Sequence, residues 1–182
     1  MSGLYGVRKP VASPAALSEK STGWQDLPNF WLDSAYLDYV VHHFGPDSQV
    51  INNAAQPMQA LYFDTAGRLV SYHVNCYVGG FPNLNWNKGN YFAQFPPRTR
   101  VPLPAPPTYE AMRTFLHPIR VTDSLPAIQQ ARPLIVVFWN YQLFRQSKNL
   151  IELVRKNAAG SGAQLVLVNT DWLYGGGDLM RK

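Results

Sequence analysis

The segment that spans residues 134–168 constrains the fold of this 182-residue chain more than any other. It opens with the apolar run LIVVFW, which is typical of a strand buried on both faces. Apolar residues then recur at helical spacing between residues 148 and 159, and LVLV at 165–168 indicates a second buried strand. A strand, a helix and a strand of these lengths predict a right-handed crossover between parallel strands. We therefore expect an α/β fold, a mixed sheet with flanking helices, with this βαβ unit at residues 133–170.

Four further elements are predicted upstream of this unit. An apolar stripe indicates a helix over residues 33–44, which Gly45 and Pro46 would end. Two apolar runs on either side of Asp64-Thr-Ala-Gly67 predict a β-hairpin over residues 58–78. A short helix is expected at 108–117, capped by Thr108, and a further turn or short helix at 123–131.

The second arm of the predicted hairpin alternates between an apolar and a more polar face. The apolar face should pack against the core and comprises Val70, Tyr72, Val74, Cys76 and Val78. Cys76 is the only cysteine, so an intramolecular disulfide and a cysteine-rich metal site are excluded, and we expect a buried, inert thiol. His42 and His43 are adjacent and lack the i, i+4 spacing of zinc ligands. We therefore expect neither a metal nor another cofactor.

Composition divides the chain into three parts. Residues 1–22 are rich in Pro, Ser and Ala without apolar periodicity, and predict a flexible leader, with order beginning near Trp24. Residues 23–174 would form one globular domain, and residues 175–182 a frayed tail. No stretch approaches the ~18 apolar residues that span a membrane.

The first residues are similar to the start of a mature bacterial lipoprotein. Ser2 to Gly6 lead into the Pro/Ser/Ala-rich stretch, and Met1 would then replace the lipid-bearing cysteine. This likeness implies a place in the cell envelope; without it, a cytoplasmic location is expected.

Charge gives little support for a nucleic-acid partner. The net charge is +5, but the basic residues are spread along the chain and never form a run of five. Pro104-x-x-Pro107 is interpreted as part of a rigid spacer rather than as a recognition motif.

The βαβ segment resembles the central unit of thioredoxin-like proteins, in which a buried strand ends in an aromatic pair and leads to Cys-x-x-Cys at a helix N-terminus. Phe138-Trp139 match the aromatic pair, and Asn169 and Asp171 match the end of the following strand. Where the two cysteines would lie, the chain has Phe144-Arg-Gln-Ser147. The resemblance therefore implies a thioredoxin-like domain without dithiol redox activity, because neither sulfur is present.

Chain order departs from that family, whose last elements are a hairpin opened by a cis-proline and a helix. The hairpin at residues 57–78, which Pro57 opens, is similar to the family's terminal hairpin but precedes the βαβ unit. Either the elements are permuted or the likeness of the hairpin is coincidental.

Two surfaces are candidates for function. The loop 140–148 follows a parallel strand and enters a helix, so its residues could hold a small anion on free N–H groups; they are Arg145, Gln146, Ser147 and Lys148. Alternatively, Ser147 only caps the helix and the cations are solvated. The loop at 79–95 would expose aromatic side chains to a protein partner, namely Trp86, Tyr91 and Phe92.

These surfaces lead to two functional hypotheses. The first is a non-catalytic, thioredoxin-like domain that serves in binding or as an accessory module. The second is an enzyme or carrier of small anions that uses the loop 140–148. No Ser/His/Asp arrangement, phosphate loop or dinucleotide fingerprint favours a specific enzyme class.

Overall fold

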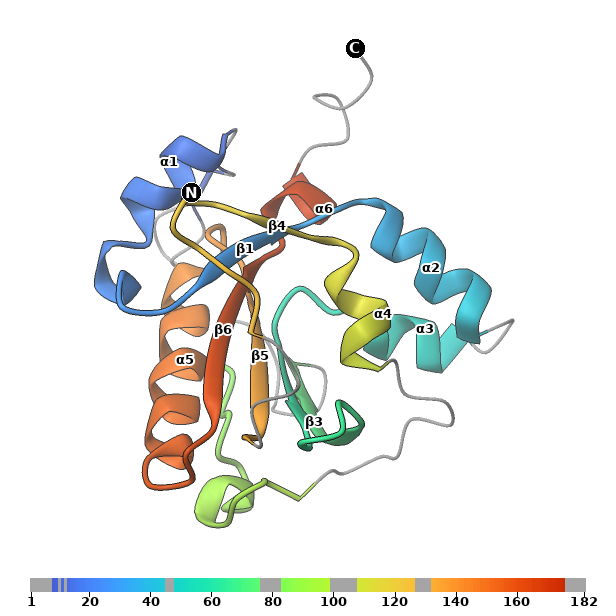
Figure 1. The fold of residues 1–182 in the computed structure, drawn as a ribbon, viewed down its shortest axis with the longest axis vertical. Coiled ribbons are helices and arrows are strands. Elements are labelled where there is room, and N and C mark those ends of the chain that lie inside the picture. The colour runs from blue at the N-terminus through green and yellow to red at the C-terminus, as the bar shows by residue number, and fades with distance from the viewer. Residues whose placement is uncertain are drawn as a thin grey trace.

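The computed structural model describes residues 8–9, 11, 13–44, 48–75, 83–98, 108–126 and 132–175. Six strands form one mixed sheet in the order β3-β2-β5-β6-β1-β4 (Figure 1). They are β1 (Asn29–Leu32), β2 (Gln59–Phe63), β3 (Leu69–Val74), β4 (Leu116–Pro118), β5 (Leu134–Trp139) and β6 (Gln164–Asn169). The α-helices are α1 (Pro14–Lys20), α2 (Ala35–Phe44), α3 (Ser48–Ala54), α4 (Tyr109–Arg113), α5 (Phe144–Ala158) and α6 (Asp171–Gly175).

The predicted βαβ unit is present at the centre of the sheet. Strands β5 and β6 pair in parallel from Leu134↔Gln164 to Trp139↔Asn169, and α5 connects them. All six residues of β5 are buried, as the continuous apolar run requires. The structure therefore confirms an α/β fold with a mixed sheet and flanking helices.

The predicted hairpin is formed by β2 and β3, which are antiparallel. Its turn is closed by Asp64, whose Oδ1 accepts hydrogen bonds of 2.9 Å from the backbone N–H groups of Ala66 and Arg68. Gly67 has a φ of 74°, which favours glycine at this position. Strand β2 also pairs antiparallel with β5, so the hairpin lies directly beside the βαβ unit.

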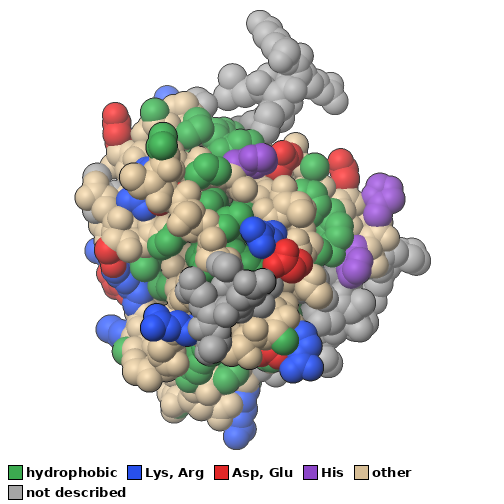
Figure 2. Space-filling view, in the orientation of Figure 1, with side chains coloured by type: hydrophobic (Ala, Val, Ile, Leu, Met, Phe, Trp, Pro, Cys, Tyr) green, Lys and Arg blue, Asp and Glu red, His purple; other side chains and the backbone are tan. Residues whose placement is uncertain are grey.

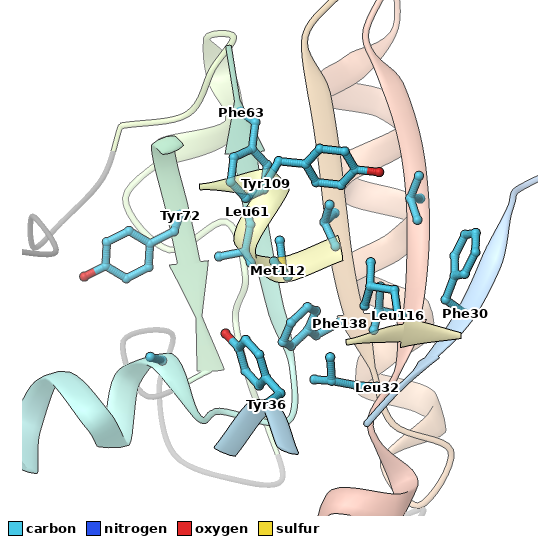
Figure 3. Close-up of a cluster of buried hydrophobic side chains, with 14 of the residues drawn as sticks. Phe30, Leu32, Tyr36, Leu61, Phe63, Tyr72, Tyr109, Met112, Leu116 and Phe138 are labelled. Atoms are coloured by element: carbon cyan, nitrogen blue, oxygen red, sulfur yellow. The ribbon is translucent and has the colours of Figure 1, made fainter. Parts of the chain in front are cut away.

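Two hydrophobic cores pack on opposite faces of the sheet. On one face, α5, α1 and the loop that contains Trp86 cover the central strands. On the other face, α2, α3 and α4 bury a second cluster, which Figure 3 shows around Tyr36, Met112 and Phe138. Burial of central strands on both faces is the main stabilising effect in such a sheet.

Strand β3 differs from the sequence prediction, because both of its faces are enclosed near its end. Val70, expected in the core, is 49% exposed. Ser71 and His73, on the more polar face, are buried: Ser71 Oγ donates a 2.5 Å hydrogen bond to the Pro97 carbonyl. The loop at 91–97 covers this face of the outer strand, which alternation within β3 does not reveal. Cys76 lies outside the described residues.

The N-terminal part also corrects the prediction, because residues 14–20 of the expected leader form α1. Ser13 caps this helix by accepting a 3.3 Å hydrogen bond from the N–H of Ala16, and Leu17 is fully buried. One buried side chain and one cap suffice to fix a short helix here, and neither produces apolar periodicity.

Two other predicted helices are present: α2 begins at Ala35, two residues after the predicted start, and α4 begins where it was predicted. Helix α2 follows the predicted range, and α4 is capped by Thr108, whose Oγ1 accepts a 3.2 Å hydrogen bond from the N–H of Ala111. Helix α4 ends earlier than expected because residues 116–118 form β4. Residues 123–126, the described part of the turn or short helix predicted at 123–131, form no helix. Residues 127–131, the predicted helix stop at Gly45 and Pro46, and the predicted tail beyond Gly175 lie outside the described residues.

Candidate functional site: the turn between β5 and α5

Ser147 is enclosed in the protein and does not face a ligand. Its Oγ donates a 2.9 Å hydrogen bond to the carbonyl of Asn140 and accepts a 3.0 Å hydrogen bond from the Asn140 N–H. The N-cap position of α5 is Leu143, which has no side-chain cap hydrogen bond. The prediction that Ser147 caps the helix is therefore wrong: its hydroxyl fastens the end of β5 to the first turn of α5.

Asp171 takes the place that the sequence assigned to an external anion. Its carboxylate is buried and accepts hydrogen bonds from the N–H of Tyr141 (2.8 Å) and the N–H of Gln142 (3.2 Å). The amide of Asn169 donates a further hydrogen bond of 2.6 Å. Burial raises the pKa of Asp171 above its ordinary value, against the hydrogen bonds from Asn169, Tyr141 and Gln142, which lower it.

The four residues predicted to hold an anion do not converge. Gln146 is buried, and its backbone carbonyl accepts a 3.2 Å hydrogen bond from Trp86 Nε1. Arg145 and Lys148 are exposed, and the Lys148 ammonium lies 3.7 Å from the carboxylate of Glu152 on the same helix. With Ser147 enclosed, this loop lacks the predicted set of anion donors.

Buried polar groups complete the ends of the central strands, and sequence reasoning missed Asn29 and Thr170 among them. Thr170 Oγ1 donates a 2.9 Å hydrogen bond to the Pro57 carbonyl, which ties the end of β6 to the start of the hairpin. Trp139 Nε1 donates a 3.0 Å hydrogen bond to Asn29 Oδ1. We call the following residues the strand-end cluster: Asn29, Asn140, Ser147, Asn169, Thr170 and Asp171. Asn140 and Thr170 directly follow the buried strands β5 and β6, and this position was their signal in the sequence.

The aromatic loop does not form the exposed surface that the sequence predicted. Trp86 is 4% exposed and Phe92 7% exposed, while Tyr91 and Phe95 are partly buried. The Asn157 amide holds this loop on α5 by donating hydrogen bonds to the carbonyls of Phe92 (2.9 Å) and Gln94 (2.8 Å). These rings anchor the loop to the rest of the protein. Their burial contradicts the prediction that Trp86 and Phe92 contact a protein partner.

No family model, curated protein or solved structure matches this chain. Function therefore has to be inferred from the residues themselves. Within the described ranges, no group of three His, Cys, Asp or Glu side chains could hold a metal ion. None of the described helices is long and apolar enough to cross a membrane.

The outer side of the turn is covered by the N-terminal segment, which sequence reasoning also missed. Arg8 donates hydrogen bonds from its backbone N–H to the Gln142 carbonyl (2.9 Å) and from its guanidinium to the Tyr141 hydroxyl (3.0 Å). The guanidinium carbon lies 4.2 Å from the centre of the Phe144 ring. The ring of Trp24 packs 5.5 Å from that of Phe144, so the segment before β1 forms one wall of the site.

Proposed function

We propose that this chain is a non-catalytic thioredoxin-like domain that serves in binding or as an accessory module. The arrangement of the sheet supports this proposal. In the family, the terminal hairpin follows the βαβ unit in sequence, whereas here β2 and β3 precede it and β2 nevertheless pairs with β5. A permuted order of the same elements accounts for both observations. The trans peptide bond before Pro57 is a departure from the family pattern.

The enclosed hydroxyl of Ser147 is the observation that supports the non-catalytic part of the proposal. Positions 144 and 147, which correspond to the two thiols, hold a partly buried aromatic ring and a hydroxyl enclosed by Asn140. A hydroxyl neither forms a disulfide nor ionises at neutral pH. Positions 144 and 147 therefore supply a packed ring and an internal hydrogen bond, and not a redox pair.

A small-anion site at this turn is disfavoured by the same geometry. The N–H groups of Tyr141 and Gln142 already donate to Asp171, so an anion would have to displace a buried carboxylate and face its charge. A binding role for the domain remains the better supported hypothesis. An accessory role at the cell envelope, which the lipoprotein-like start suggests, belongs to the same proposal.

Introduction of a thiol pair at positions 144 and 147 tests the proposal. In a Cys76→Ser background, Phe144→Cys with Ser147→Cys should form an intramolecular disulfide in a glutathione buffer, because the first turn of a helix brings these positions into disulfide geometry. The matched control is Glu152→Cys with Arg155→Cys, which has the same spacing in the middle of α5. We expect the disulfide at 144 and 147 to be about tenfold more favourable than that of the control.

Two results would contradict the proposal. Equal disulfide stability in both pairs would remove the correspondence between this turn and the thioredoxin-like dithiol site. Catalysis of thiol–disulfide exchange by the unmodified chain would remove the non-catalytic assignment.

A further inference from the structure

The turn before α5 forms a cradle around a single arginine. We call Tyr141, Gln142 and Phe144 the arginine cradle. The guanidinium carbon of Arg8 lies 5.0 Å from the centre of the Tyr141 ring and 4.2 Å from that of the Phe144 ring. The carbonyl of Gln142 accepts a hydrogen bond from the backbone N–H of Arg8. The Tyr141 hydroxyl accepts a further hydrogen bond from the guanidinium. A planar guanidinium that packs on aromatic faces while its edge donates hydrogen bonds uses features that lysine lacks.

A buried carboxyl group holds the backbone of the cradle in place. The carboxylate of Asp171 accepts the N–H groups of Tyr141 and Gln142, so it lies against the same stretch of backbone that holds Arg8. When ionised, this carboxylate attracts a cation at the cradle and repels an anion. The carboxyl group is held in this position by the fold, because Asp171 is buried and the Asn169 amide donates a hydrogen bond to it.

Arg8 itself is attached weakly, whereas the chain after it is attached firmly. Arg8 and Lys9 are exposed, so the hydrogen bond and ring contacts of the guanidinium form in contact with solvent, where such contacts are worth little. Val11 and Leu17 are buried in the core on the α5 side of the sheet. Arg8 can therefore leave the cradle while the segment stays anchored at Val11.

We propose that the arginine cradle is a recognition site for an arginine-bearing peptide segment of a partner protein, and that Arg8 occupies this site in cis. The inference rests on the proposed binding function and names its site and ligand class. A tethered segment acts at an effective concentration in the range of about 1 mM, so the partner must compete with Arg8. The N-terminal segment thus limits access to the cradle until a partner displaces it.

Binding of a labelled peptide to the full-length chain tests this inference. The probe is a fluorescent peptide with the sequence of residues 2–13, and fluorescence anisotropy reports its affinity. Arg8→Ala should bind the probe about two- to fivefold more tightly than the unmodified chain, because the competing side chain is gone and an exposed contact of this kind is worth a factor in that range. The matched control is Lys9→Ala, which changes the neighbouring exposed residue and should bind like the unmodified chain.

Two further measurements locate the site. In the Arg8→Ala chain, Tyr141→Ala should abolish the gain in affinity, and Tyr141→Phe, which keeps the ring, should reduce it. A probe in which lysine replaces the arginine should bind more weakly than the original, because lysine cannot stack as a plane.

Either of two outcomes would overturn the inference. If the three chains bind the probe equally, or if Arg8→Ala does not bind it, Arg8 only tethers the N-terminal segment. If the gain survives Tyr141→Ala, the peptide binds elsewhere. The test is independent of the thiol-pair experiment, so the cradle can fail while the thioredoxin-like, non-catalytic proposal stands.

Discussion

The carboxylate of Asp171 is buried, and most of its hydrogen bonds come from backbone N–H groups of the turn after β5. Two N–H groups of the turn after β5 and the amide of Asn169 donate to it. Burial of a charged group is unfavourable unless hydrogen bonds compensate, and here they compensate only in part, since its pKa is raised. The residue therefore fixes the turn while ionisation at neutral pH reduces the stability of the fold.

Asp171→Asn should lower the free energy of unfolding by about 1–3 kcal/mol. The amide offers one acceptor oxygen in place of two, so the N–H of Tyr141 or of Gln142 loses its partner. Because the folded-state pKa of Asp171 is raised, its contribution to stability is full below about pH 4 and declines as the pH rises through the folded pKa. The difference between the two chains should therefore be largest in acid, as urea unfolding across pH would measure.

An exposed aspartate supplies the control for this experiment. Asp38→Asn on α2 should change the free energy of unfolding by less than about 0.5 kcal/mol. Parallel stability curves for Asp171→Asn and the unmodified chain would show that Asp171 has the same pKa in the folded and unfolded states.

Among the elements, α1 depends on a single core contact. Leu17→Ala should lower the free energy of unfolding by about 2–5 kcal/mol, because a fully buried leucine is lost and a cavity remains in the core shared with α5. Glu19→Ala, on the exposed side of the same helix, should have little effect. If both variants unfold at the same urea concentration, the leader predicted from composition is the better description of residues 14–20.

Elements whose burial follows a local apolar pattern could be predicted from the sequence, and elements fixed by distant contacts could not. The apolar runs of β5 and β6 and the stripe of α2 are local patterns, and the structure confirms all three. The burial of Trp86 depends on α5, and that of His73 on the loop with Phe92, to whose ring it lies at 4.6 Å. These partners are more than 15 residues away in sequence, so the spacing of apolar residues within one element does not indicate them.

At the turn after β5, the sequence predicted the gathering of polar residues but not their hydrogen-bond partners. The turn after β5 does collect polar residues, as expected at the carboxyl ends of parallel strands. Its donors are used internally, however, because Asp171 and Ser147 approach the turn from β6 and α5. The exposed surface of the domain otherwise mixes charged, polar and apolar side chains on the face shown in Figure 2, without a large field of one sign.

At the scale of the whole molecule, we expect the sheet to tolerate a different order of its strands in the chain. The described ends of the chain meet at the same turn: Arg8 donates to the carbonyl of Gln142, and Asp171 accepts its N–H. A short linker can therefore join the two ends. A permuted chain opened within residues 127–131 would begin with the βαβ unit and place the hairpin after it, which is the order in thioredoxin-like proteins.

This circular permutant should fold to the same sheet, with a free energy of unfolding within a few kcal/mol of the original, because a break between β4 and β5 cuts neither strand and changes mainly the entropy of loop closure. Circular dichroism and urea unfolding would measure both properties. A second permutant, opened between Tyr141 and Gln142, is the matched control. It cuts the backbone that donates to Asp171 and should be far less stable. If the first permutant fails to fold while the second succeeds, the sheet depends on the native chain order and the permuted relationship to the thioredoxin-like fold is untenable.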